Sequence, residues 1–187
     1  MIYIDDNIDA IELETALTLL PEWRRKQALA HRHELDRRLS VAAYRLLAAA
    51  AETEFGLKDL PEFGYAEGGK PYIPGHPDIH FNLSHCPVAA LCATSHSPVG
   101  ADIERIRPYN AALARRVLND AEMAGVEASA RPEVEFARLW TMKESLLKLT
   151  GEGIRRDLKS ALDGCTARFS TTVNTARGYV FTVCTER

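Results

Sequence analysis

The spacing of apolar residues along the first third of the chain predicts one strand followed by helices. Leu35 to Phe55 is rich in alanine and favours a long helix, which Gly56 can end. Gly and Pro then recur from Pro61 to Pro77, and this punctuation indicates a loop without regular structure. The predicted elements of this part are a strand at Ile2 to Ile4, a helix at Ile11 to Leu20, a helix whose first turn contains Pro21, and the helix at Leu35 to Phe55.

The rest of the chain repeats the change between helical spacing and alternation. In the strand Val99 to Ile103, the side chains of Val99, Ala101 and Ile103 share one face, and Gly100, Asp102 and Glu104 share the other. Residues 110 to 150 return to helical spacing, broken near Gly125 and at Arg131-Pro132. The other predicted strands are Ile79 to Ser84, Val88 to Thr94, Ala167 to Val173 and Tyr179 to Thr185, with a turn at residues 95 to 98.

Helices followed by strands therefore occur twice. This order predicts an α+β protein built from two similar α+β halves, residues 1–97 and 98–187, that form one compact unit. The length of 187 residues and the 46% share of apolar residues are sufficient for such a core.

Charge narrows the possible partners. The formal net charge is −3, without the basic excess that nucleic acids or anionic membranes attract, so we expect neither partner. The bases are nevertheless concentrated: residues 23 to 45 carry seven bases against two acids, on predicted helices. No apolar run is long enough for a membrane span, and the first residues do not resemble a signal peptide, so we expect a cytoplasmic protein. Its four cysteines include no CxxC pair and are expected to be core residues.

Two groups of residues suggest a metal site. Asp102 and Glu104 lie on one strand face, where two carboxylates can share a divalent cation, although an isolated pair more often lies on a solvated face. Glu144 and Lys148 fall opposite the apolar stripe of the helix that contains Trp140, where Glu followed by Lys is also an ordinary surface pair. A third carboxylate there could complete an oxygen site, and Mg²⁺ would suit it because Mg²⁺ takes its remaining ligands from water and substrate phosphates.

A third group could hold phosphate. Lys70 and Pro71 lie on a Gly-Gly-Lys-Pro loop, and the strand that follows ends in Ser84-His85. A loop lysine is usually solvated and a histidine at the end of a strand usually bonds nearby backbone, so each residue alone is a weak signal. The combination is more specific.

Together, the segments GKPYIP, FNLSH, VGADIE and WTMKESLLKLTGEG, in this order, resemble a 4′-phosphopantetheinyl transferase of the Sfp type. The resemblance implies the fold of that family and transfer of the phosphopantetheine arm of coenzyme A to a serine of an acyl, peptidyl or aryl carrier protein, with release of 3′,5′-ADP. Coenzyme A is then a substrate. The resemblance also implies a monomer, because Sfp-type enzymes contain both halves in one chain.

The resemblance also assigns residue roles. Asp102, Glu104 and Glu144 match the Mg²⁺ ligands, expected about 2.0 to 2.1 Å from the bound ion. The other matches are Lys148 and His85 with phosphate contacts, Lys70 and Pro71 with residues that line the coenzyme, Lys143 with the residue before the metal-binding Glu, and Arg38 with a base at the 3′-phosphate. Relatives often have Lys where this chain has Trp23, so Arg24, Arg25 and Lys26 stay open as replacements.

The implied mechanism leaves two points open. Glu144 is our candidate for the base that deprotonates the carrier serine, directly or through a metal-bound water, while Lys148 and His85 neutralise phosphate charge. The alternatives are a noncatalytic module that binds coenzyme A or the carrier, and a Mg²⁺-dependent pyrophosphate hydrolase. We also expect a carrier-docking patch after the metal strand, in which arginines surround apolar residues. It comprises Arg105, Arg107, Arg115 and Arg116 around Ile106, Val117 and Leu118.

Overall fold

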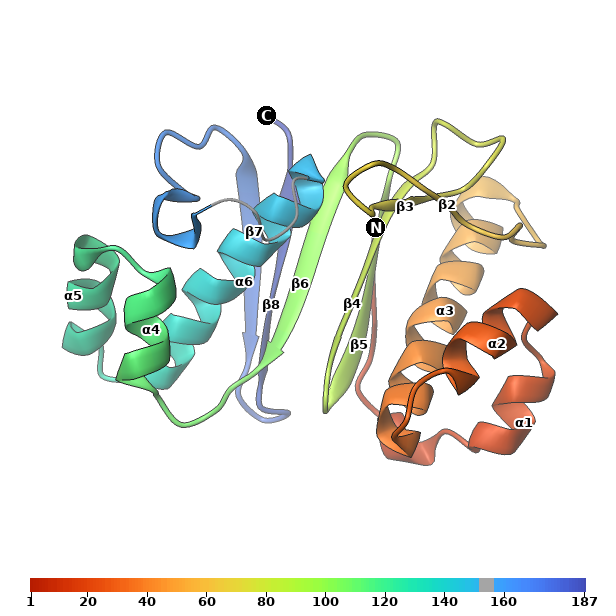
Figure 1. Cartoon of the computed structure of the whole chain (residues 1–187), viewed down its shortest axis with the longest axis horizontal. Helices are drawn as coiled ribbons and strands as arrows, with labels where there is room; N and C mark the ends of the chain where they lie inside the picture. Colours follow the sequence, from red (N-terminus) through yellow and green to blue (C-terminus); the bar gives the residue numbers. More distant parts are fainter. Residues whose placement is uncertain (152–156) are drawn as a thin grey trace.

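The computed structural model describes residues 1–151 and 157–187 and contains two three-stranded sheets with helices on their outer sides (Figure 1). The first sheet has the strand order β1-β5-β4, and the second has the order β6-β8-β7. The helices are α1 (Leu13–Thr18), α2 (Glu22–Leu29), α3 (Glu34–Phe55), α4 (Ala111–Val117), α5 (Asp120–Ala128) and α6 (Pro132–Thr150), with short 3-10 turns at Ile8–Ala10 and Leu158–Ser160. The strands are β1 (Ile2–Asp5), β2 (Gly64–Tyr65), β3 (Pro71–Tyr72), β4 (His80–Cys86), β5 (Ala89–Ser95), β6 (Val99–Arg105), β7 (Arg168–Asn174) and β8 (Tyr179–Thr185).

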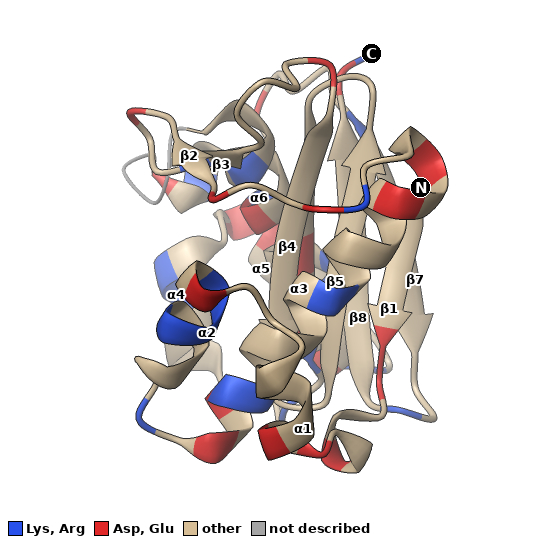
Figure 2. Cartoon of the chain, turned by 90° about the vertical axis from the view of Figure 1, so that its right-hand side faces the viewer, with Lys and Arg blue, Asp and Glu red and all other residues tan. Residues whose placement is uncertain are grey.

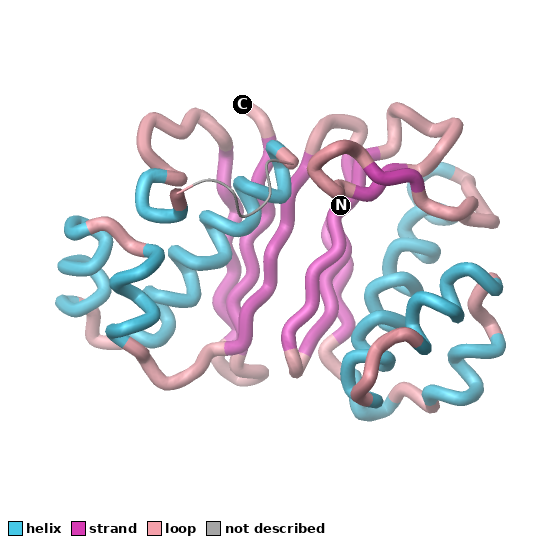
Figure 3. The backbone as a smooth tube through the Cα atoms, in the orientation of Figure 1, coloured by secondary structure: helices cyan, strands magenta, loops and turns pink. Residues whose placement is uncertain are grey.

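The central strand of the first sheet is buried on both faces. Ala90 and Cys92 of β5 pack in the cluster that contains α3, whereas Leu91 and Ala93 pack against residues of the second sheet. A strand covered on both sides needs no polar face, which explains the continuous apolar run in β5. The layers therefore run from α3 through the first sheet and the second sheet to α6 (Figure 3).

The predicted division of β6 into two faces is confirmed. Val99, Ala101 and Ile103 lie in the apolar cluster between the two sheets. Gly100 lies on the other face under α6, where a side chain would meet the main chain of Ser145 and Leu149. The face of β6 that carries Asp102 is therefore the face that α6 covers.

On the edge of β6 that faces β4, main-chain N–H groups donate hydrogen bonds to side chains of β4 and not to the main chain of a neighbouring strand. The Asn82 side-chain oxygen accepts a hydrogen bond from Ala101 N at 3.1 Å, and Ser84 Oγ accepts one from Ile103 N at 3.3 Å. Asn82 and Ser84 are two residues apart and thus lie on the same face of β4. Alternate side chains of one sheet therefore satisfy main-chain donors of the other.

Most predicted elements are confirmed within a few residues, including the α+β class and the end of α3 at Gly56, which has φ 67°. Two predictions are wrong. The loop after Pro61 contains the short antiparallel pair β2 and β3, and Gly125 lies inside α5 instead of at a break. One helical break lies just before Asn119, whose side chain caps α5 in a capping box with Glu122. The predicted break at Arg131-Pro132 is confirmed, because α6 begins there.

Two further observations concern the cysteines and the length of the apolar helices. All four cysteines are free thiols, and three of them are buried, as expected for core residues. Among the described residues, no helix has the length and apolar character needed to cross a membrane.

The contact between β6 and α6 predicts a large effect of a single methyl group. A Cβ at position 100 would lie 2.0 Å from the Ser145 carbonyl oxygen, so Gly100→Ala must displace α6 and should cost about 2 to 4 kcal/mol of unfolding free energy. Gly125→Ala in α5 is the matched control, since its Cβ meets nothing within 4 Å, and it should be neutral or stabilise by up to about 1 kcal/mol. Equal stabilities of the two variants in urea unfolding would contradict this account of the packing.

Candidate active site

Strands β4 and β6 and helix α6 bring six of the predicted site residues into one cavity. The cavity has a volume of about 410 Å³, and Leu83 and Trp140 complete its lining. The six residues are Ser84 and His85 from β4, Asp102 and Glu104 from β6, and Glu144 and Lys148 from α6. Residues separated by up to 64 positions thus share one solvent-filled space.

Asp102 is the most buried of the acids and is held by two partners. Its Oδ1 accepts a hydrogen bond from Ser84 Oγ at 2.9 Å and an ion pair from Lys148 Nζ at 2.5 Å. Lys148 Nζ also donates to Ser84 Oγ at 3.0 Å. The serine hydroxyl has one proton and two lone pairs, and the bonds to Asp102, Lys148 and Ile103 N use all three. Ser84 therefore positions Asp102 and Lys148.

The pKa values of the other two acids, Glu104 and Glu144, are raised in this cavity. Burial raises the pKa of Glu104 to about 7, and the charge of Asp102 adds to the effect, while Arg107 and Lys148 oppose it. Burial and the charge of Asp102 also raise the pKa of Glu144, against the influence of Lys148. Three acids in one cavity with one close ammonium thus retain an excess of negative charge.

The acids fit a divalent cation. The second carboxylate oxygen of Asp102, Oδ2, is buried and has no hydrogen-bond partner, and Glu104 and Glu144 add further hard oxygen donors to the same cavity. Within residues 1–151 and 157–187, no three His, Cys, Asp or Glu side chains already stand in the arrangement of a metal site. Lys148 is bonded to Asp102 Oδ1 instead.

His85 lies beside further basic groups. Desolvation by the surrounding protein lowers the pKa of His85, His31 and Lys148 lower it further, and Asp36 opposes them. Burial and the neighbouring bases therefore favour the neutral imidazole, which can donate one hydrogen bond. Sequence reasoning missed His31, because nothing in its spacing relates it to a histidine on a strand 54 positions later.

A second cavity adjoins the first on the side of the Gly-Pro loop. Its volume is about 310 Å³, and Lys70 and Pro71 line it together with Glu144 and Lys148. Gly68 of the loop lies against the end of α6, where a Cβ would be 1.8 Å from the Gly151 carbonyl oxygen. Only glycine fits there. The end of the corresponding motif, Glu152 and Gly153, lies outside the described residues.

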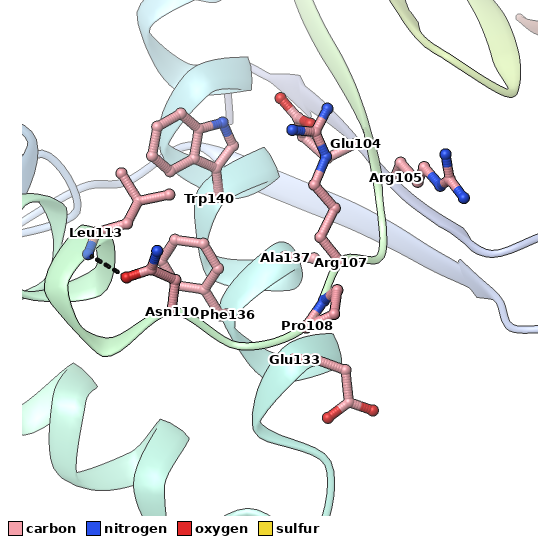
Figure 4. A pocket seen from close by; sticks show the side chains of 10 residues that line it. All are labelled: Glu104, Arg105, Arg107, Pro108, Asn110, Leu113, Glu133, Phe136, Ala137 and Trp140. Carbon is pink, nitrogen blue, oxygen red and sulfur yellow. Dashed lines mark hydrogen bonds between the residues drawn. The ribbon is translucent and has the colours of Figure 1, made fainter.

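A third cavity of about 360 Å³ adjoins the acids on the opposite side (Figure 4). It shares Glu104 and Trp140 with the central cavity. Phe136 and Trp140 form an apolar wall in Figure 4, and Arg107 extends beside Glu104. Asn110, which caps α4 by accepting a hydrogen bond from Leu113 N at 3.1 Å, lies at the same cavity.

Lys143, next to Glu144 in the chain, points away from the cavity into the protein. Its side chain is 1% exposed, and Nζ bonds Glu122 Oε2 and the Leu158 carbonyl oxygen, both at 2.7 Å. It therefore holds α5 and the Leu158–Ser160 turn behind α6. Glu122 is a second residue that sequence reasoning missed, since a Glu in the first turn of a helix usually serves only as a cap.

The bases of the early helices have other contacts. Arg38 bonds Glu34 at 2.7 Å and the Asp9 carbonyl oxygen at 3.3 Å, it does not line the cavity of the acids, and its buried Nε has no partner. Arg24 bonds Ser40 and lies over the Tyr44 ring. Figure 2 shows basic positions on α2 and α3 with acidic positions between them.

The aromatic cluster explains Trp23. Its ring contacts Phe63 at a centroid distance of 4.8 Å and Tyr44 at 5.7 Å, so position 23 belongs to the core of the first sheet in this chain. Of the three bases that the sequence left open as replacements, Arg24 is half-buried and bonds Ser40, while Arg25 and Lys26 are exposed.

The predicted docking patch needs a correction. Arg105, Arg107, Arg115 and Arg116 are exposed as expected. Val117 and Leu118 cannot form the apolar centre, because both are buried in the cluster beneath α4 with Val126 and Leu139. The half-buried Ile106 and Leu113, which is 40% exposed on α4, are the apolar residues that remain at this surface.

Comparisons with known proteins show the family of this chain. The model of the 4′-phosphopantetheinyl transferase superfamily matches residues 98–184. A 4′-phosphopantetheinyl transferase of Bacillus subtilis is 32% identical over 163 residues, which are 85% of this chain and 72% of that protein. The transferase Sfp of Bacillus subtilis strain 168 is 31% identical over 162 residues with the same coverage, and AcpT of Salmonella typhimurium is 40% identical over 121 residues, which are 62% of this chain and 60% of AcpT. The chain therefore belongs to the 4′-phosphopantetheinyl transferase superfamily, as a member of its Sfp type.

The contact between Ser84 and Asp102 can be measured by a double-mutant cycle. Because Ser84 Oγ donates to a buried carboxylate, the variants Ser84→Ala and Asp102→Ala should show a coupling of about 1 to 3 kcal/mol in unfolding free energy. Ser97→Ala, at an exposed serine, paired with Asp102→Ala is the control and should show no coupling. Additive effects of Ser84→Ala and Asp102→Ala would exclude the positioning role of Ser84.

Proposed function

We propose that this chain transfers the 4′-phosphopantetheine group of coenzyme A to a serine of an apo carrier protein and releases 3′,5′-ADP. The observation that carries the proposal is the meeting of Ser84, His85, Asp102, Glu104, Glu144 and Lys148 in one cavity of a member of this family. Such a cavity combines cationic and imidazole groups for phosphate with oxygen donors for a cation.

The three adjoining cavities match the parts of coenzyme A. The pyrophosphate of the coenzyme joins a nucleotide to a pantetheine arm, so its two sides need separate space. We place the pyrophosphate beside His85 and Lys148, the nucleotide beside Lys70 and Pro71, and the arm beside Trp140. Shared residues set this order. The central cavity shares Glu144 and Lys148 with the cavity beside Lys70, and it shares Glu104 and Trp140 with the cavity beside Phe136.

The reaction is the attack of a carrier serine oxygen on the β-phosphorus of coenzyme A. A new P–O bond forms to the serine, and the bond to the 3′,5′-ADP oxygen breaks. Negative charge grows on the phosphate oxygens, and Lys148 and His85 are placed to stabilise it. Glu144 is the proposed base for the serine proton, directly or through a metal-bound water, because its carboxylate lines the cavity in which we place the pyrophosphate.

Mg²⁺ is the proposed metal, held by Asp102, Glu104 and Glu144. When bound, it would offset the charge of the acids and of the pyrophosphate. The unpartnered Oδ2 of Asp102 and the raised pKa values of Glu104 and Glu144 support this choice.

We also propose that residues 1–97 and 98–187 are two similar halves of a monomer that acts in the cytoplasm. Each half contains a three-stranded antiparallel sheet with one long helix, α3 or α6, packed on it. Residues of both halves, Ser84 and His85 from the first and Asp102, Glu104, Glu144 and Lys148 from the second, line the same cavity, which supports a site formed within one chain.

The central experiment measures the mass of an apo carrier protein after incubation with the chain, coenzyme A and Mg²⁺. The carrier should gain the mass of one phosphopantetheine, and Glu144→Gln should lower the rate at least about 100-fold by removing the base. Its unfolding free energy should stay within about 1 kcal/mol of wild type, since the carboxylate is only half-buried. Glu127→Gln, at an exposed acid of α5, is the control and should transfer normally. An unmodified carrier would reject the transferase and leave a binding module or, if coenzyme A is cleaved, a hydrolase.

If Arg38 contacts the 3′-phosphate, its removal should affect the KM for coenzyme A more than the KM for dephospho-coenzyme A. Arg38→Ala should raise the KM for coenzyme A about tenfold and change the KM for dephospho-coenzyme A, which lacks this phosphate, less than about twofold. The unpartnered Nε of Arg38 supports the assignment. His31→Ala is measured in parallel, because His31 is the other base beside the cavity. Discrimination lost in His31→Ala and kept in Arg38→Ala would move the contact to His31.

A further inference from the structure

The ammonium of Lys70 is bonded to protein groups of the second sheet and its helix. Lys70 Nζ donates to the Leu149 carbonyl oxygen at 2.9 Å and to the Val99 carbonyl oxygen at 3.1 Å. Val99 begins β6, which carries Asp102 and Glu104, and Leu149 is in the last turn of α6, which carries Glu144 and Lys148. One side chain therefore fastens both elements that supply the acids.

The loop that carries Lys70 is itself held in place. The hydrogen bonds Ala66 N to the Lys70 carbonyl oxygen, 2.9 Å, and Gly69 N to the Ala66 carbonyl oxygen, 2.8 Å, close the turn between β2 and β3. Gly69 has φ 79°, which favours glycine, and Pro71 fixes the next φ. The main chain of Lys70 thus stands in a fixed position above the end of α6.

The end of α6 is a favourable place for this cation. The last carbonyls of a helix lack helical partners and carry the negative end of the helix dipole. Close packing of Gly68 on Gly151 brings the loop to these carbonyls, since any side chain at position 68 would collide with the Gly151 carbonyl oxygen. Burial lowers the pKa of Lys70, which agrees with an ammonium that is withdrawn from water.

We infer that Lys70 is a positioning residue: its ammonium holds the Gly68–Pro71 loop against α6 and β6, and thereby sets the width of the cavity beside the loop. We call this contact the Lys70 clamp. The loop forms one wall of that cavity, and Leu147, Lys148 and Gly151 form the other. The inference rests on the proposed function, because it assigns the nucleotide of coenzyme A to this cavity.

The clamp predicts a defined kinetic effect. Lys70→Met keeps the apolar stem and removes the ammonium, so the KM for coenzyme A should rise about tenfold. The KM for dephospho-coenzyme A should rise by the same factor, because the clamp acts on the wall of the cavity and not on the 3′-phosphate. The KM for the carrier and kcat should stay within about twofold, since Thr141 still bonds Thr182 at 2.7 Å and α6 still packs on Gly100 at Ser145 and Leu149. A general loss of stability would lower the active fraction and leave the KM unchanged.

A second variant disrupts the close packing of Gly68 on Gly151 and keeps the Lys70 ammonium. Gly68→Ala must move the loop away from Gly151, so it should raise both coenzyme KM values as Lys70→Met does. Lys58→Met, at an exposed lysine, is the matched control for loss of a positive charge and should leave both values unchanged.

Hydrogen exchange of the protein without coenzyme provides the readout that does not depend on activity. Amides in the last turn of α6 and at its C-cap, residues 147 to 151, should exchange faster in Lys70→Met than in wild type. Unchanged exchange, or a KM increase confined to coenzyme A, would overturn the clamp and make Lys70 a direct phosphate contact or an idle residue. If the wild-type chain modifies no carrier, the proposed function fails, and the exchange experiment still decides the clamp.

Discussion

The buried edge of β6 is the constraint on which the site depends. Main-chain groups of Val99, Ala101 and Ile103 face away from β8 in an apolar environment and must find partners within the protein. Side chains from the region of the first sheet supply them: Lys70 bonds Val99, Asn82 bonds Ala101 and Ser84 bonds Ile103. The cavity of the acids lies beside this edge, where β4, β6 and α6 meet.

The same solution places a carboxylate where burial would otherwise be costly. Asp102 is 4% exposed, and an unpaired charge at such a position destabilises a fold by several kcal/mol. Ser84 and Lys148 satisfy only one of its two oxygens. Burial raises the pKa values of the neighbouring Glu104 and Glu144, and the charge of Asp102 adds to the effect. An arrangement that retains unbalanced negative charge next to an open cavity is typical of a functional site, where a ligand supplies the missing partner.

Local periodicity predicted the parts of this site that depend on one element. A period of two placed Asp102 and Glu104 on one face, and helical spacing placed Glu144 and Lys148 opposite an apolar stripe. Contacts between elements were beyond such reasoning: Ser84, Asp102 and Lys148 meet only because β4, β6 and α6 pack together. Lys143 illustrates the same limit, since a lysine on a helix is normally solvated and only the position of Glu122 explains its burial. Gly125 was wrongly predicted to break a helix. Glycine usually weakens helices, but the Asn119 capping box and the burial of Val126 keep α5 helical through it.

The central claim is that the cavity between β4, β6 and α6 holds the pyrophosphate of coenzyme A together with a divalent cation. The most direct measurement is a crystal structure with coenzyme A and Mn²⁺, a stand-in for Mg²⁺ whose anomalous signal locates the ion. The account predicts one Mn²⁺ peak beside Asp102, Glu104 and Glu144, and pyrophosphate density next to Lys148 and His85. Pyrophosphate bound elsewhere on the chain, with no ion beside these three acids, would contradict it.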